Sequence, residues 1–178
     1  LAAGRRFGKA AGEGGAEHRL GALPADMELG RQRPKEVGDP AVARWVRPAP
    51  LGGPYEPFEV EALITREARH WREHGFGLWA VRAAGDAAFV GQVGLQRTFV
   101  AGADRVEIGW ALRPRWWRQG MASEAAAAAL HVALDDLELD EVVSFTLPDN
   151  LASRGVMEKI GLRYGRDISH RGRSAGRS

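Results

Sequence analysis

The sequence predicts an α/β fold of the mixed α+β kind, in which helices cover both faces of a mostly antiparallel sheet. Three observations support this. Short apolar segments joined by turn residues follow one another between 77 and 112, and an alanine-rich helical stretch follows over 121–137. Strand, helix and strand patterns then alternate to residue 168. Consecutive hairpins followed by alternating helices and strands produce a mixed sheet with helices on its two sides.

The first 38 residues contain eight glycines and no sustained apolar period. Such a segment buries too little apolar surface to offset its ordering entropy, so we expect it to be largely disordered. The folded domain is then expected over 39–170, with a basic tail at 171–178. A short helical turn is expected from Asp39 to Val46.

The helix expected next begins at Pro57, a residue favoured at the first helical position, and ends before Gly75. Its apolar residues lie mostly on one face. The strands and helices that follow are bounded by turns that contain glycine, aspartate or proline. We expect strands at 77–82, 88–97, 105–112, 141–147 and 162–168, and helices at 121–137 and 150–160.

Composition excludes several kinds of protein. The chain has no cysteine, so disulfides, thiolate catalysis and cysteine-based zinc sites are excluded, and a reducing cytoplasm is compatible. No apolar run approaches the roughly 20 residues that cross a bilayer. The net charge of +2 comes from the two ends, because residues 39–162 hold 13 basic and 17 acidic side chains. Nucleic-acid binding is therefore not expected, and the C-terminal arginines are interpreted as a solvated tail.

The strongest local signal is the segment from Trp116 to Glu124, which places Gly120 between a strand and a long helix. The first amides of a helix lack partners and lie at the positive end of its dipole, so they form an anion site. Gly120 allows close approach of a phosphate, and the small Ala122 and Ser123 keep the approach free. The alternative is a helix start that merely contains a glycine.

Three patterns in order resemble the GNAT family of N-acetyltransferases. Trp117-x-x-Gly120-x-Ala122 resembles its pyrophosphate loop, with Trp117 where Arg or Gln is usual. Val106-Glu-Ile-Gly-Trp110 resembles its fourth strand, and Asn150-x-x-Ser153 with Glu158-Lys-Ile-Gly-Leu162 resembles a later block. The tryptophan makes the match most similar to the branch of ribosomal-protein N-terminal acetyltransferases.

The resemblance implies acetyl-CoA as acyl donor, a primary amine as acceptor (a protein N-terminus or a small amine), and no metal. In this family the fourth and fifth strands splay, and the pantetheine arm lies between them beside the fourth. The residues expected to bind the donor are Ile108, Gly109 and Trp110 on the strand, Arg118, Gln119, Gly120, Met121, Ala122 and Ser123 at the turn, and Asn150.

Acyl transfer to an amine requires a base for the amine and a proton for the departing thiolate. Strand alternation places Glu107 on a face with small residues, where it is the candidate base, and a surface-facing glutamate is the alternative. Many relatives use a tyrosine as the acid, but Met157 stands there and cannot donate a proton. Ser153 is the nearest substitute, with helix packing as its alternative. Asn150 is expected to contact coenzyme A or to fix the loop after the strand; helix capping is the alternative, and the two roles are compatible.

Other aromatic and histidine residues are interpreted as structural. Trp116 and Trp117 could stack on adenine, although packing in the core is favoured. No histidine has a spacing to carboxylates that suggests a metal site.

Both ends differ from the family pattern, since no apolar strand is evident in 1–38 and no final strand follows 162–168. We therefore expect the first and last strands to be missing and a sheet edge to be exposed at 162–168. Weak homodimerisation or aggregation through that edge is favoured, and a poorly ordered terminus with an incomplete acceptor wall is the alternative. A non-catalytic, acyl-CoA-binding relative is the alternative function.

Overall fold

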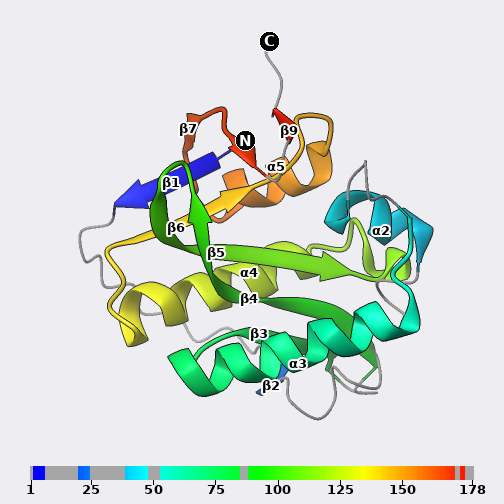
Figure 1. The fold of residues 1–178 in the computed structure, drawn as a ribbon. Helices are drawn as coiled ribbons and strands as arrows, with labels where there is room; N and C mark the ends of the chain where they lie inside the picture. The colour runs from blue at the N-terminus through cyan, green and yellow to red at the C-terminus, as the bar shows by residue number, and fades with distance from the viewer. Residues whose placement is uncertain are drawn as a thin grey trace.

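The computed structural model describes the backbone of residues 2–6, 20–24, 39–47, 53–84, 88–170 and 173–174, and the side chains of 39–47, 53–84 and 88–168. Seven strands form one sheet in the order β2-β3-β4-β5-β6-β1-β7 (Figure 1). All neighbouring strands are antiparallel except β5 and β6. The mixed, mostly antiparallel sheet is therefore confirmed. The strands are β1 (Ala2–Arg6), β2 (Leu20–Pro24), β3 (Leu78–Ala83), β4 (Phe89–Val100), β5 (Ala103–Leu112), β6 (Glu141–Phe145) and β7 (Tyr164–Arg166).

The N-terminal 38 residues contribute two of these strands, so the expectation of no strand there is wrong. β2 pairs with β3 at one end of the sheet, and β1 lies between β6 and β7 at the other. Strand pairing uses backbone groups and depends on the neighbouring strand, so these segments pair without the alternating apolar pattern that predicts a strand. The rest of 1–38 lies outside the described residues, and its expected disorder stays a prediction.

The C-terminal end also differs in detail. β7 is shorter than the predicted strand, and β8 (Ser169–His170) pairs with β9 (Arg173–Ser174) in a separate two-stranded sheet. The tail predicted at 171–178 therefore includes the short strand β9, and its remaining residues lie outside the described part of the chain.

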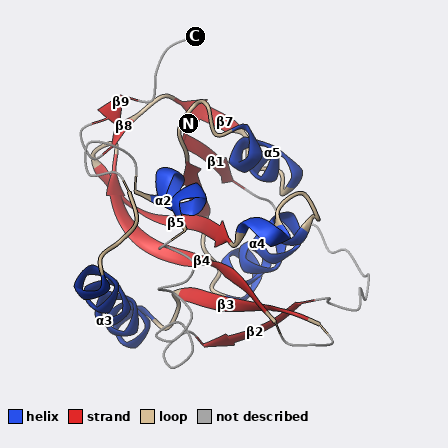
Figure 2. Ribbon diagram, turned by 90° about the vertical axis from the view of Figure 1, so that its right-hand side faces the viewer, coloured by secondary structure: helices blue, strands red, loops and turns tan. Residues whose placement is uncertain are grey.

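Helices cover both faces of the sheet, as predicted. Figure 2 shows α4 and α5 on one side of the sheet and α3 on the other. The helix α3 begins with a capping box between Glu56 and Glu59 and ends at Gly75, whose φ of 73° is left-handed. None of the described helices is long and apolar enough to cross a membrane. The helices are α2 (Pro40–Val46), α3 (Pro57–His74), α4 (Met121–His131), followed by a π-helical turn (Val132–Asp136), and α5 (Leu151–Lys159).

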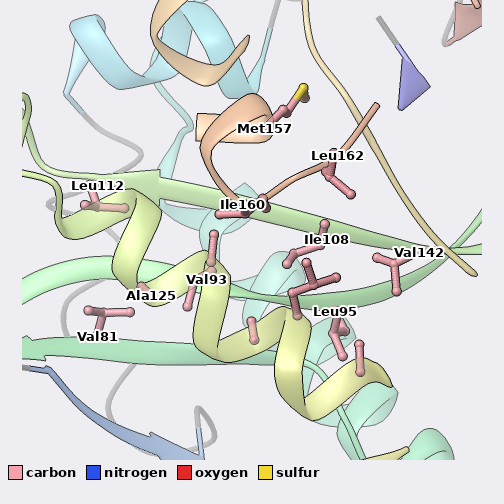
Figure 3. Packing of buried hydrophobic residues seen from close by; sticks show 14 of the residues in the cluster. Val81, Val93, Leu95, Ile108, Leu112, Ala125, Val142, Met157, Ile160 and Leu162 are labelled. Atoms are coloured by element: carbon pink, nitrogen blue, oxygen red, sulfur yellow. The ribbon is translucent and has the colours of Figure 1, made fainter. Parts of the chain in front are cut away.

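The main core lies between the sheet and the pair α4 and α5. Leu95, Ile108 and Val142 are at most 1% exposed and come from three adjacent strands. Figure 3 shows these side chains directed toward α4, where Ala125 allows close approach, and toward Ile160. Because alternate residues of β5 fill this core, the residues between them face α2 and α3. This alternation positions the candidate site.

Candidate active site at the split between β5 and β6

The strands β5 and β6 separate after a single registered pair, Glu107 with Val143. On its other edge β5 stays paired with β4 along its whole length, from Ala103 to Leu112. The stretch from Ile108 to Leu112 therefore has no registered partner in β6. An unpaired strand edge presents backbone donors and acceptors to which an extended ligand can pair. Ile108, Gly109 and Trp110 lie in this stretch.

An ion pair holds the two strands together at the closed end of the split. Arg105 on β5 donates from Nη1 to Oε1 of Glu141 on β6. Arg105 lies two residues before Glu107, and Glu141 lies two residues before Val143. The separation of the strands consequently begins beyond a point where side chains and backbone both join them.

Two helix N-termini lie at the edge of the sheet toward which the split opens. Because β5 and β6 are parallel, their carboxyl ends reach the same edge, and a helix follows each strand. α4 follows β5 and α5 follows β6, and the two helices pack against each other (Figure 2). The sequence-predicted phosphate turn and Asn150 thus lie at the same edge.

The turn before α4 has the geometry of an anion site. Gly120 is its N-cap with a φ of 81°, and Arg118 also has a positive φ, of 60°. As a glycine, the N-cap residue offers no side chain to cap this end of α4. A Cβ built at Gly120 meets nothing within 4 Å, so the space at this position is open. The first amides of the 11-residue helix lie next to this exposed glycine, at the positive end of the helix.

Residues around this turn differ in exposure. Arg118, Gln119 and Gly120 are exposed, Ala122 and Ser123 are half-buried, and Met121 is 8% exposed with its side chain in the core. Met121 can thus offer only its backbone to a ligand.

Tryptophans 116 and 117 have different environments. Trp116 packs against the main core, as predicted. Trp117 is 41% exposed, and its indole Nε1–H donates to Leu112 O at 2.7 Å, so the core interpretation is wrong for this residue. The hydrogen bond fastens the turn to the last residue of β5.

Asn150 caps α5. Its Oδ1 accepts from Ser153 N at 3.2 Å, and the side chain is 6% exposed. The capping interpretation is therefore confirmed for the side-chain oxygen. Ser153 lies half-buried in the first turn of α5, while Met157, one turn later, is 2% exposed in the core. Of these two side chains, only the Ser153 hydroxyl can donate a proton.

Glu107 lies on the face of β5 that is turned away from the main core. Its neighbours Val106 and Ile108 are buried, whereas Glu107 and Gly109 are half-buried. Oε1 of Glu107 is 4.0 Å from the position that a Cβ would occupy on Gly109. The carboxylate thus leans along the strand over Gly109, toward the stretch without a partner in β6. The structure therefore places the Glu107 carboxylate beside Gly109, one of the strand residues expected to bind the donor.

Sequence reasoning missed a polar pair beside Glu107. Glu67 on α3 is 3% exposed, and both its oxygens accept from Gln96 Nε2 of β4, at 2.8 and 2.7 Å. Arg66 Nη2 also donates to Glu67, at 3.1 Å. Gln96 is the registered partner of Glu107 across β4 and β5. The signal was present, since Glu67 falls seven residues after Val60 and four before Trp71 on the apolar face of α3.

His70 joins the same two elements one turn later. Its Nε2 accepts from Arg97 N at 2.9 Å, so Nδ1 carries the proton and donates to Phe76 O at 2.8 Å. Burial is the largest cause that lowers the pKa of His70, and the backbone carbonyl of Phe76 partly opposes it. The neutral ring is therefore the form that holds α3 on β4. No group of three metal-binding side chains occurs among the residues that the structure describes.

Comparison with known proteins agrees with this geometry. A family model described as "Acetyltransferase (GNAT) domain" matches residues 31–163. FsC-acetyl coenzyme A-N(2)-transacetylase of Aspergillus fumigatus is 36% identical over 159 residues, covering 84% of this chain and 60% of that protein. The chain spans 63% and 60% of the length of two curated relatives that it matches.

Solved structures show the same fold. A GNAT-family acetyltransferase from Bacillus anthracis has a TM-score of 0.68 and 25% identity, with 84% of this chain and 82% of that chain covered. Spermidine N-acetyltransferase from Vibrio cholerae, solved with CoA and spermine, has a TM-score of 0.68 over 88% of this chain and 91% of that chain. At 16% identity, this second likeness shows the fold alone.

Proposed function

Because the chain belongs to the GNAT acetyltransferase domain family, we propose that it transfers the acetyl group of acetyl-CoA to a primary amine. The observation that supports the proposal is the split after the single pair Glu107–Val143, with the glycine-capped N-terminus of α4 at its open end. A strand edge can pair with an extended arm and a helix N-terminus can bind phosphates, which are the two contacts that we propose for the CoA thioester.

The donor binds in two parts. Backbone amides from Arg118 to Ser123 receive the pyrophosphate, because the left-handed Gly120 leaves the turn open and α4 adds its dipole. The pantetheine arm pairs with the edge of Ile108, Gly109 and Trp110. Asn150 holds the start of α5 beside the arm through its cap on Ser153 N.

The reaction forms one bond and breaks one. The neutral amine attacks the thioester carbonyl, the new C–N bond forms, and the C–S bond breaks to release the CoA thiolate. The Glu107 carboxylate accepts the proton that the amine loses, directly or through water. A backbone N–H of the unpaired stretch of β5 stabilises the oxyanion. The Ser153 hydroxyl donates a hydrogen bond to the thiolate, which then takes its proton from solvent.

The acceptor is a primary amine, either on a small molecule or at a protein N-terminus. The Aspergillus relative is named for N(2)-acetyl transfer, and the Vibrio structure contains spermine. The tryptophan-containing turn supports the ribosomal-protein branch, which is the finer form of this proposal. The absence of cysteine is compatible with a reducing cytoplasm as the place of action.

Amine-dependent release of the CoA thiol tests the proposal. The purified chain is incubated with acetyl-CoA and spermidine, 2-phenylethylamine or a tetrapeptide with a free N-terminal serine. We expect thiol release with at least one amine, together with one acetyl group added to that amine by mass spectrometry. Tight acetyl-CoA binding with no amine-dependent release would instead identify an acyl-CoA-binding protein, and absence of binding would contradict both functions.

A further inference from the structure

Packing of α3 on β4 does not by itself require a buried carboxylate at Glu67. Burying a carboxylate costs several kcal/mol unless its hydrogen bonds are satisfied, and apolar residues of similar volume often replace buried polar pairs without loss of stability. The cationic neighbour Arg66 is itself half exposed, so Gln96 is the main buried hydrogen-bond partner of the Glu67 carboxylate. One turn later, His70 already joins α3 to β4 through the backbone amide of Arg97.

The consequence of the pair is the orientation of the Gln96 amide. Since Nε2 donates to both Glu67 oxygens, the carbonyl Oε1 on the same carbon is turned away from Glu67. Hydrogen bonds described for this side chain use only Nε2. Directly opposite residues of an antiparallel pair have Cβ atoms about 4.5–5.5 Å apart, and Gln96 is opposite Glu107. Glu67 therefore fixes the orientation of the amide and leaves the Gln96 carbonyl oxygen as an acceptor on the sheet face that Gln96 shares with Glu107.

Two acceptors side by side match a group with several N–H donors. A carboxylate and a carboxamide oxygen cannot bond to each other, whereas a primary amine or ammonium can donate to both. We propose that Gln96 is a specificity-determining residue that accepts a hydrogen bond from the acceptor amine beside Glu107, and that Glu67 is the positioning residue that orients it. This inference rests on the proposed acetyl transfer. It predicts that the site prefers a primary amine to the N-methylated form of the same amine.

The decisive variant replaces both partners. Changing Glu67 and Gln96 together to methionine preserves their approximate shape and leaves no buried group unpaired, so the melting temperature should stay near that of the wild type. The matched control is His70→Gln, which alters the other contact between α3 and β4. Glu67→Gln alone is a second test, because its amide can donate to Gln96 Oε1 and turn the carboxamide around.

Steady-state kinetics are measured with the best amine of spermidine, 2-phenylethylamine and the N-terminal serine peptide, and with its N-methylated form. In the double variant and in Glu67→Gln, we expect the KM for the primary amine to rise about ten- to a hundredfold, the usual effect of losing a hydrogen bond to a charged group. The KM for acetyl-CoA should not change, kcat should change less than the amine KM, and the preference over the N-methylated amine should shrink.

Three outcomes overturn the inference. An unchanged amine KM in a folded double variant or in Glu67→Gln would show that the pair only docks α3. An equal rise in His70→Gln would show that helix docking, and not the orientation of Gln96, controls amine binding. If the wild type releases no thiol with any amine, the proposed function fails and the inference fails with it. Thiol release by the wild type with no effect in the variants removes the inference alone.

Discussion

Replacing Gly120 by alanine separates backbone strain from cofactor contact, because the chain contains a matched glycine. Gly102, in the turn between β4 and β5, has a φ of 82° against 81° at Gly120. A Cβ built at either position meets nothing within 4 Å. Gly102 directly precedes β5, and Gly120 comes after the opposite end of that strand, whose 10 residues span about 30 Å.

Strain should be equal in the two variants. An L-residue in the left-handed region costs about 1–2 kcal/mol, so both should lose that much unfolding free energy. For a chain of this size, the loss corresponds to a fall of about 2–8 °C in melting temperature. Only Gly120→Ala adds a methyl group at the turn that we propose to bind the phosphates. Its acetyl-CoA affinity should therefore fall by about 1–3 kcal/mol, roughly five- to 150-fold.

Calorimetric titration with acetyl-CoA, combined with thermal denaturation of both variants, measures the two effects separately. We expect equal melting temperatures and an affinity loss confined to Gly120→Ala. Wild-type acetyl-CoA affinity in both folded variants would refute binding at the phosphate turn, and an equal loss of affinity in both would show that strain alone acts.

Four further predictions concern the chemistry and the fold. Glu107→Gln should lower kcat/KM by roughly 10²–10⁴ near neutral pH and leave acetyl-CoA affinity unchanged, and full activity across pH 6–9 would exclude Glu107 as the base. Ser153→Ala should lower kcat with little change in acetyl-CoA affinity. An unchanged rate constant for thiol release in pre-steady-state measurements would assign Ser153 to packing alone. The folded-state pKa of His70 lies below its ordinary value of 6.5, so its contribution to stability is complete above that pH and is lost as the pH falls through the folded-state value. Urea unfolding between pH 5 and 8 should show this acid-side loss, and His70→Gln should reduce it; equal pH dependence in both proteins would contradict the assignment. All three residues of β7 are exposed at the sheet edge, so light scattering should detect a weak dimer, whereas a strictly monomeric protein at high concentration would exclude it.

Local chemistry made much of the described fold predictable. Gly75 ends α3 and Gly120 begins α4, both in the left-handed conformation that glycine adopts without strain. Alternation along β5 correctly placed Glu107 and Gly109 on the face opposite Ile108. These features depend on residues close in sequence, and for that reason a single chain reveals them.

Features that depend on distant segments were missed. The strands β1 and β2 pair through their backbones, and their side-chain patterns do not indicate which strands they pair with. The contact between Glu67 and Gln96 joins residues 29 positions apart on different elements. A carboxylate within an apolar helix face signals a buried polar partner, but it does not identify that partner. The exposure of Trp117 likewise depends on how its turn folds against Leu112.

Hydrogen exchange of backbone amides, with and without acetyl-CoA, shows whether the donor occupies the split between β5 and β6. We expect added protection in two segments, from Ile108 to Trp110 and from Arg118 to Ser123. The turn at Ala101 and Gly102, at the far end of β5, should exchange at the same rate in both states. Protection confined to other parts of the sheet, or no change at either segment at saturating acetyl-CoA, would contradict the account.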